Sequence, residues 1–178
     1  FASDLVSPIF AEYPPETMKR GDIYWYNDCY LSRGAVTHTP DQVLIAPVYA
    51  DDELIGFSQT WAHFADIGGM RPGSLSPDCT EIFQEGTMVP PVRLSRDGVV
   101  QEDLLKVFIR NCRFPALVRG DLRAMLAAVG LGEKRLEELA LGFGATELRI
   151  AFTELLARTE AAVRSRLRAL VPPGKYHF

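Results

Sequence analysis

The residues best suited to chemistry are two histidines and an aspartate in the first half of the chain. His38 and Asp41 stand three apart in T-H-T-P-D-Q, and His63 occurs in W-A-H-F-A-D-I-G-G-M. Two imidazole nitrogens and a carboxylate oxygen suit a divalent first-row metal, and such a set admits Zn, Mn and Fe alike. Three protein ligands also leave coordination positions open, as catalysis by a metal requires.

The elements around these residues should bring them together. Residues 41–50 contain V-L-I-A-P-V-Y, which predicts a buried strand, and residues 53–63 predict its antiparallel partner after an Asp-Asp turn. Two antiparallel strands joined by a tight turn place their outer ends side by side. His63 should therefore lie close to Asp41, although the two residues are far apart in sequence.

Spacing alone leaves two interpretations of these residues open. The pattern His-x-x-Asp occurs by chance, and a histidine at a strand end is commonly a hydrogen-bonded structural group. Three further polar residues, Asn27, Asp28 and Asp66, are candidates for orienting the ligands or contacting a substrate. Their alternative roles are a turn at Asn27-Asp28 and a loop salt bridge between Asp66 and Arg71.

Composition and charge exclude several classes of function. The chain has 178 residues, of which 47% are hydrophobic and 24% charged, as in an ordinary globular protein, and its net charge is −4. The sequence contains no basic block, no apolar run long enough to span a membrane and no phosphate-binding glycine loop. We therefore expect no nucleic acid partner, no membrane association and no cofactor bound by this chain other than the metal.

The cysteines and the two chain ends indicate in which compartment the protein works and whether the chain is part of a longer one. The 3 cysteines are far apart and lack a C-x-x-C spacing, which indicates a reducing compartment. No secretory signal is recognisable at the start of the chain, so we expect a cytoplasmic protein. Because the chain starts at Phe1 without an initiator Met and ends abruptly, we also expect it to be part of something longer.

The amino-acid composition changes along the chain. Residues 20–98 are rich in Gly, Pro, Tyr, Trp and β-branched residues, whereas residues 99–171 are rich in Leu, Ala, Arg and Glu. This contrast predicts an α+β fold, with a β-rich N-terminal half that carries a hairpin and ordered Gly/Pro loops, and a helical C-terminal half. We expect residues 1–98 to form part of a β-rich metal-site region and residues 99–178 a helical region, as one continuous piece of a larger catalytic subunit.

Capping and breaking residues predict where helices begin and end. Ser76-Pro77 resembles a helix start and Gly86 a helix end, which predicts a short helix between them. In the second half, glycines and hydrophobic periodicity predict four further helices, over residues 101–111, 121–129, 133–141 and 146–170.

Three runs of sequence resemble the hydantoinase B family. They are G-D-I-Y-W-Y-N-D-C-Y, T-H-T-P-D-Q-V-L-I-A-P-V-Y and W-A-H-F-A-D-I-G-G-M-R-P-G-S-L-S-P-D-C-T-E-I-F-Q-E-G-T-M-V-P-P-V-R-L. The family includes B subunits of ATP-dependent hydantoinases, the matching part of 5-oxoprolinase, and alpha-type subunits of acetone and acetophenone carboxylases. The resemblance implies that His38, Asp41 and His63 bind the metal, together with an acidic ligand from a segment upstream of Phe1.

The resemblance also implies a reaction and a partner. A hydantoinase A-type subunit would bind ATP and phosphorylate a small ketone or cyclic amide, and this chain would supply the metal chamber. Hydrolase members of the family tend to carry G-G-T-H and a second histidine after the later one, whereas this chain has S-R-G-A-V-T-H and Phe64 after His63. These departures favour a ketone carboxylase over an amide hydrolase. Cys29 replaces the proline that usually follows Asn-Asp.

A function of another class stays open beside these two. The Leu- and Ala-rich helical half could dock larger subunits, which would make the chain a non-catalytic assembly module.

Overall fold

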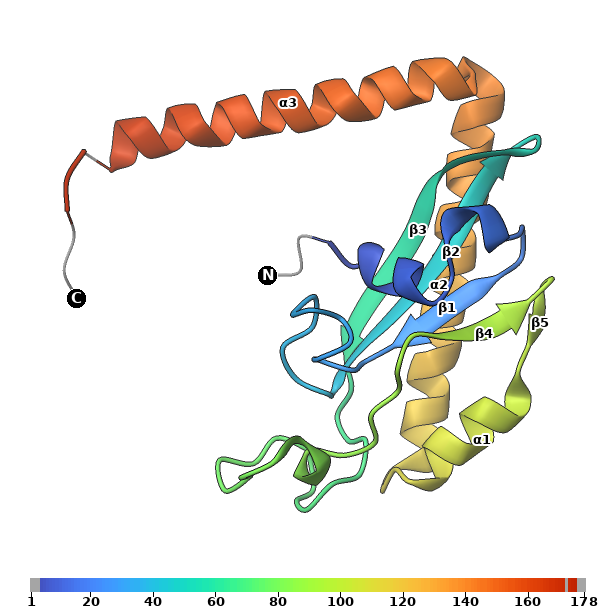
Figure 1. Ribbon diagram of the computed structural model, residues 1–178, viewed down its shortest axis with the longest axis vertical. Helices are drawn as coiled ribbons and strands as arrows, with labels where there is room; N and C mark the ends of the chain where they lie inside the picture. The colour runs from blue at the N-terminus through green and yellow to red at the C-terminus, as the bar shows by residue number, and fades with distance from the viewer. Residues whose placement is uncertain (1–3, 172, 176–178) are drawn as a thin grey trace. The chain divides into compact units, whose positions relative to one another are not determined.

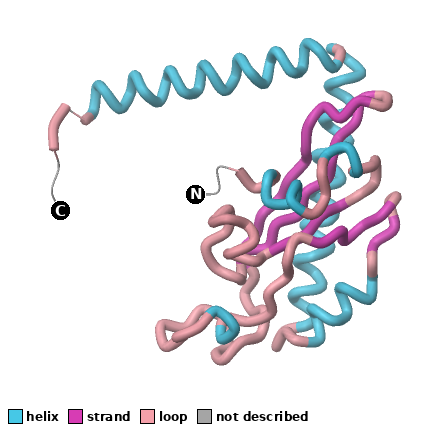
Figure 2. The backbone as a smooth tube through the Cα atoms, viewed as in Figure 1, coloured by secondary structure: helices cyan, strands magenta, loops and turns pink. Residues whose placement is uncertain are grey.

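The computed structural model describes residues 4–171 and 173–175 (Figure 1). The chain forms two compact units, Phe1–Glu137 and Glu138–Phe178. The first unit contains a five-stranded sheet, and most of the helical residues lie in the second half of the chain (Figure 2). The predicted α+β class is therefore confirmed. The expected division into regions at residue 98 stays a prediction.

The sheet is antiparallel throughout, with the strand order β3-β2-β1-β4-β5. The strands are β1 (Ile23–Tyr26), β2 (Asp41–Ala50), β3 (Glu53–His63), β4 (Val92–Arg96) and β5 (Val99–Val100). The β2–β3 hairpin has the bounds that the sequence predicted. Its alternating and β-branched residues determine this result locally, since a tight turn between two such runs fixes which residues face each other.

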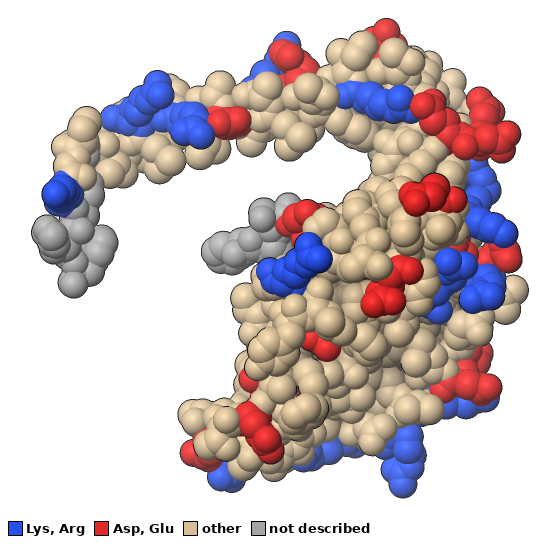
Figure 3. Space-filling view, viewed as in Figure 1, with Lys and Arg blue, Asp and Glu red and all other residues tan. Residues whose placement is uncertain are grey.

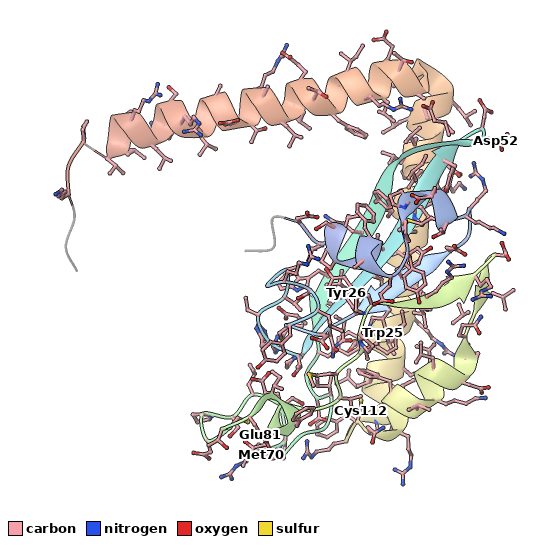
Figure 4. All side chains as sticks on the ribbon, viewed as in Figure 1. Trp25, Tyr26, Asp52, Met70, Glu81 and Cys112 are labelled. Atoms are coloured by element: carbon pink, nitrogen blue, oxygen red, sulfur yellow. The ribbon has the colours of Figure 1, made fainter. Side chains whose placement is uncertain are left out.

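The two faces of the sheet are covered by different elements. Trp25 and Leu44 lie in a hydrophobic cluster with residues of α1 (Glu102–Arg110) and of α2 (Pro115–Phe143), and the Trp25 and Phe108 rings meet edge to face. The neighbouring Tyr24 and Tyr26 belong to a second cluster, with residues around the 3-10 helix η1 (Ser7–Ala11). Trp25 and Tyr26 are labelled in Figure 4. The alternation of side chains along β1 therefore separates two buried layers.

Helix α2 runs without a break, which corrects the sequence prediction of two helices over residues 121–129 and 133–141. Gly130, taken as the end of the first of these helices, lies inside α2, where a Cβ atom would meet nothing within 4 Å, whereas Gly132 lies against the hairpin. A Cβ atom at Gly132 would overlap the side chain of Ser58 on β3, and the Ser58 hydroxyl donates to the Val129 carbonyl over 2.7 Å. A small residue is therefore needed where the helix approaches the hairpin.

The helix expected between Ser76 and Gly86 is also wrong. Only the single 3-10 turn η3 (Ile82–Gln84) forms there. Polar side chains bind the backbone N–H groups that a helix would use: the Gln84 Oε1 atom accepts from Thr80 over 2.7 Å and from Glu81 over 3.4 Å, and the Ser76 hydroxyl accepts from Asp78 over 3.2 Å. Such local bonds compete with helix formation.

The remaining helices lie close to their predicted positions. Helix α1 and helix α3 (Ala145–Leu170) match the expected segments to within about one residue, and a further 3-10 turn, η2, covers Pro15–Thr17. Two exposed ion pairs lie on α3, Arg158–Glu154 and Arg164–Glu160, and the two residues of each pair are one helical turn apart. Within the described part of the chain, no helix combines the length and the apolar character that crossing a membrane requires.

A buried carboxylate fixes the glycine-rich loop that follows β3. Asp66 is fully buried and accepts hydrogen bonds from the backbone of Gly68, Gly73 and Arg113 over 2.9–3.1 Å, and from the Arg113 side chain over 3.0 Å. The Arg113 guanidinium also donates to the carbonyls of Gly68, Gly69 and Arg71. Arg71 pairs with Asp78 rather than with Asp66, so the expected loop salt bridge is wrong.

The Asp66 carboxylate predicts an acid-sensitive contribution to stability. Burial raises the pKa of Asp66. The hydrogen bonds from Arg113, Gly68 and Gly73 together lower it by more than burial raises it, so the net shift is downward. The contribution is therefore present above the unfolded-state pKa of about 3.9 and lost as the pH falls through the lower folded-state value. Asp66→Asn should lower the free energy of unfolding at pH 7 by about 2–4 kcal/mol and make the acid limb shallower, as measured by urea unfolding.

The matched control is Asp78→Asn, because Asp78 lies on the same loop in an ion pair whose side chains are 58% and 59% exposed. Its effect should stay below about 1 kcal/mol. Equal effects of the two substitutions would contradict the role of the buried pair.

Candidate metal centre

The hairpin register brings the three predicted ligands together. Asp41 and His63 are direct partners at the open end of the β2–β3 ladder, and His38 lies one turn before β2, where the Asp41 N–H donates to the His38 carbonyl. His38 Nε2 lies 3.0 Å from His63 Nδ1 and 3.1 Å from Asp41 Oδ1, and His63 Nδ1 lies 3.0 Å from the same Oδ1 atom. Three candidate ligand atoms thus form a nearly equilateral triangle.

Burial and hydrogen bonding orient these side chains differently. The Asp41 side chain is 6% exposed, whereas those of His38 and His63 are 32% and 40% exposed. The Thr37 hydroxyl lies 3.1 Å from His38 Nδ1. If Nδ1 carries the proton and donates to Thr37, the Nε2 lone pair is left facing Asp41 and His63. The site therefore combines a buried carboxylate with two imidazoles that are open on their outer side.

The donor set and its spacing fit a divalent metal. The three ligand atoms all lie within 4.8 Å of one another, as a shared ion requires. For bonds of about 2.1 Å, neighbouring ligands are about 3.0 Å apart in an octahedron and about 3.4 Å apart in a tetrahedron. The observed distances of 3.0–3.1 Å are close to these values, so the three side chains fit a shared divalent ion.

Asn27 fixes the turn that carries the first two ligands. It is fully buried, and its amide donates to the Thr39 carbonyl over 2.8 Å and to the Thr87 carbonyl over 2.9 Å, while its Oδ1 atom accepts from the Val89 N–H over 2.5 Å. Thr39 stands between His38 and Asp41 in sequence. The side chain of Asn27 thus joins the ligand turn to the segment that precedes β4.

Gln42 is a second buried amide beside the ligand turn, and sequence reasoning missed it. Its Nε2 atom donates to the carbonyls of Thr39 and Pro40 over 3.1 and 3.3 Å, and its Oε1 atom accepts from the Trp25 indole over 2.9 Å. The signal in the sequence was a glutamine at the start of an otherwise apolar strand. Buried polar groups require partners, so such a residue indicates a specific network.

The other two polar candidates anchor loops. Asp28 Oδ1 accepts from the backbone of Tyr30 and Leu31 over 2.8 and 2.9 Å, which stabilises the turn that the sequence suggested there. Asp66 binds Arg113 and the glycine-rich loop, as described above. A role of Asn27, Asp28 or Asp66 in contacting substrate stays a prediction.

The electrostatic surroundings of the site are acidic. Burial raises the pKa of the Cys29 thiol to about 11, and the nearby carboxylates of Glu85, Asp28 and Asp41 add to this shift. The thiol is therefore protonated at neutral pH, which disfavours it as a nucleophile. The same negative charges favour a bound cation.

An apolar cavity adjoins the ligands. It has a volume of about 550 Å³ and is lined by Leu5, Ala35, Val36, Thr37, His38, Asp41 and Trp61. Its walls are mainly hydrocarbon, with two candidate ligands at one side, which is typical of a site for a small organic molecule. On the face of the described residues drawn in Figure 3, basic and acidic side chains are interspersed rather than gathered into one basic patch.

Comparison with known proteins identifies the family. The family model described as hydantoinase B/oxoprolinase matches residues 2–178, almost the whole chain. The chain belongs to the hydantoinase B/oxoprolinase family. The crystal structure of the ATP-dependent caprolactamase from Pseudomonas jessenii has the same fold, with a TM-score of 0.82 at 32% identity over 94% of this chain and 28% of that one.

The relatives of this chain are named for different activities. The caprolactamase subunit beta of Pseudomonas jessenii is 34% identical over 90% of this chain and 27% of its own length. The acetophenone carboxylase delta subunit of Aromatoleum aromaticum is 29% identical over 97% of this chain and 25% of its own length. The chain thus spans about a quarter of the length of these relatives.

The geometry predicts a structural cost for removing the Asn27 amide. Asn27→Ala would leave the carbonyls of Thr39 and Thr87 and the N–H of Val89 without these partners. The free energy of unfolding should fall by about 2–4 kcal/mol, as measured by urea unfolding. The control is Asn111→Ala, since Asn111 is an exposed amide that donates to the Val107 carbonyl of its own helix. A loss in Asn27→Ala no larger than in this control would refute the prediction.

Proposed function

We propose that this chain supplies the metal centre of an ATP-dependent enzyme of the hydantoinase B family. The observation that carries the proposal is the convergence of His38, Asp41 and His63, whose candidate ligand atoms lie 3.0–3.1 Å apart beside an apolar cavity. Three ligand atoms that converge on one point suit a shared cation.

The side chains divide the work of such a site. His38, Asp41 and His63 would hold Zn, Mn or Fe, and a bound ion would supply Lewis-acid polarisation of a carbonyl or carboxyl oxygen. The buried Asp41 carboxylate offsets part of the positive charge. The cavity walls, among them Val36 and Trp61, would hold the hydrocarbon part of the substrate and exclude water from it.

The reaction we propose is ATP-dependent carboxylation of a ketone. An ATP-binding partner of the hydantoinase A type would phosphorylate the ketone as its enol and activate bicarbonate. Water would cleave the O–P bond of the enol phosphate, and the enolate carbon would attack the carboxyl carbon of carboxyphosphate beside the metal centre. The carbon–carbon bond would form as the C–O bond to phosphate breaks, so that two phosphate ions leave. Two features support this version: Phe64 stands where hydrolase members tend to carry a second histidine, and the acetophenone carboxylase subunit aligns with 97% of the chain.

A cyclic amide hydrolase is the second candidate, because identity to the caprolactamase subunit, at 34%, is higher than the 29% to the carboxylase subunit. In this version the same cavity would hold a phosphorylated lactam or imide, and water would attack the carbonyl carbon. Both versions place the enzyme in the cytoplasm, as part of an assembly with the ATP-binding partner.

The metal content of the purified native assembly tests the centre. The wild type should contain about one equivalent of Zn, Mn or Fe per chain, and His38→Ala should lose it, because the loss of one imidazole ligand weakens metal binding. Elemental analysis measures both. Gln59→Ala is the matched control, since Gln59 is exposed on the same strand as His63 and outside the triangle.

Activity separates an enzyme from an assembly module. If the double variant His38→Ala with His63→Ala assembles normally and keeps its activity, the chain acts as a non-catalytic module and the proposed centre is wrong.

The two reactions differ in the fate of bicarbonate. With acetone or acetophenone, ATP and ¹⁴C-bicarbonate, the assembly should form an acid-stable labelled product, and omission of ATP should abolish it. Scintillation counting after acidification measures the label. ATP-dependent opening of caprolactam, 5-oxoproline or hydantoin without incorporation of label would instead establish the hydrolase.

A further inference from the structure

Glu85 reaches the ligand turn from a distant part of the chain. Its Oε2 atom accepts from the Thr39 N–H over 3.3 Å and from the Thr39 hydroxyl over 3.1 Å. Thr39 is fully buried, whereas Glu85 is half-buried. On its other side, the Thr39 carbonyl accepts from Asn27 and Gln42. The hydrogen-bonding groups of Thr39, which directly follows His38, are thus held from both sides by side chains.

The backbone around Glu85 is itself fixed by the glycine-rich loop after β3. The Met70 N–H donates to the Gln84 carbonyl over 2.8 Å, and the Thr87 N–H donates to the Ile67 carbonyl over 3.0 Å. Residues 67–70 and 84–87 are therefore joined by two backbone hydrogen bonds where the segments approach each other, and we call this contact the backbone crossing. Met70, labelled in Figure 4, belongs to the first of these two segments.

Two glycines make this crossing possible. A Cβ atom at Gly69 would overlap the Gln84 carbonyl oxygen and lie 2.7 Å from the Glu85 carbonyl carbon, and one at Gly86 would lie 2.7 Å from the Ile67 carbonyl oxygen. Both glycines also have positive φ angles, 81° and 131°. Gly69 and Gly86 thus allow the backbone of Glu85 to approach closely enough for its carboxylate to reach Thr39.

We propose that Glu85 is a positioning residue for the metal centre. Its carboxylate fixes the backbone between His38 and Asp41, so that the two ligands are arranged before the metal binds. Partners that orient ligands in this way typically change metal affinity about 10- to 100-fold. This inference rests on the proposed function, since it requires that the triangle binds a metal.

The test compares divalent metal affinities of the chelator-treated native assembly. Zn²⁺ and Mn²⁺ are titrated by isothermal calorimetry into the wild type, Glu85→Ala, Glu85→Gln and the control Glu12→Ala, whose side chain is exposed on the same unit. Glu85→Ala should weaken binding about 10- to 100-fold, and Glu85→Gln should recover most of the loss because its amide oxygen can accept both Thr39 bonds. Glu12→Ala should bind as the wild type does.

The outcomes separate the inference from the proposed function. Wild-type affinity in Glu85→Ala overturns the positioning role, while absence of binding to the wild type overturns the metal centre itself. Equal losses in Glu85→Ala and Glu85→Gln also overturn positioning, because the amide keeps the acceptor. If Glu85→Ala does not fold, Thr39→Val decides: it removes only the hydroxyl donor, and unchanged affinity in this variant rejects the inference.

Discussion

The antiparallel register of the β2–β3 hairpin is the constraint on which the candidate site depends. Asp41 faces His63 across the ladder, so both side chains project on one side of the sheet. A slip of one residue would turn one of them to the opposite face, into the layer of Trp25 and Leu44. Because the apolar residues of the two strands bury in separate layers, the hydrophobic effect itself opposes that slip and keeps the ligands together.

A second layer of organisation surrounds the ligand turn and is polar rather than apolar. The amides of Asn27 and Gln42 and the carboxylate of Glu85 all bind Thr39, a residue that has no metal-binding group at the centre. Buried polar networks of this kind are costly when incomplete and specific when complete. In the proposed centre, residues that do not contact the metal would thus control the geometry of the ligands.

The hairpin and the proximity of His38, Asp41 and His63 could be predicted from the sequence, because both follow from local alternation of side chains and a two-residue turn. The sequence did not contain a readable signal for the continuity of α2: Gly130 was taken as a helix end, although it lies inside the helix, and the packing of Gly132 against Ser58 is visible only in three dimensions. The helix predicted from Ser76 was wrong for a related reason, since the Gln84 side chain binds backbone N–H groups that such a helix would use. The role of Glu85 could not be predicted, because nothing in its neighbourhood points to Thr39.

The sequence separations within the site have a consequence for how the chain folds. Asn27 and Val89 are 62 positions apart, Thr39 and Glu85 are 46 apart, and Asp66 and Arg113 are 47 apart. Contacts of such long range close large loops, and they form late compared with a hairpin. We therefore expect the β2–β3 hairpin to bring Asp41 and His63 together before the long-range contacts of Thr39 form. On that order, Asp41 and His63 would stand side by side before the turn that carries His38 is fixed, and the proposed three-residue centre would be complete only in the folded chain.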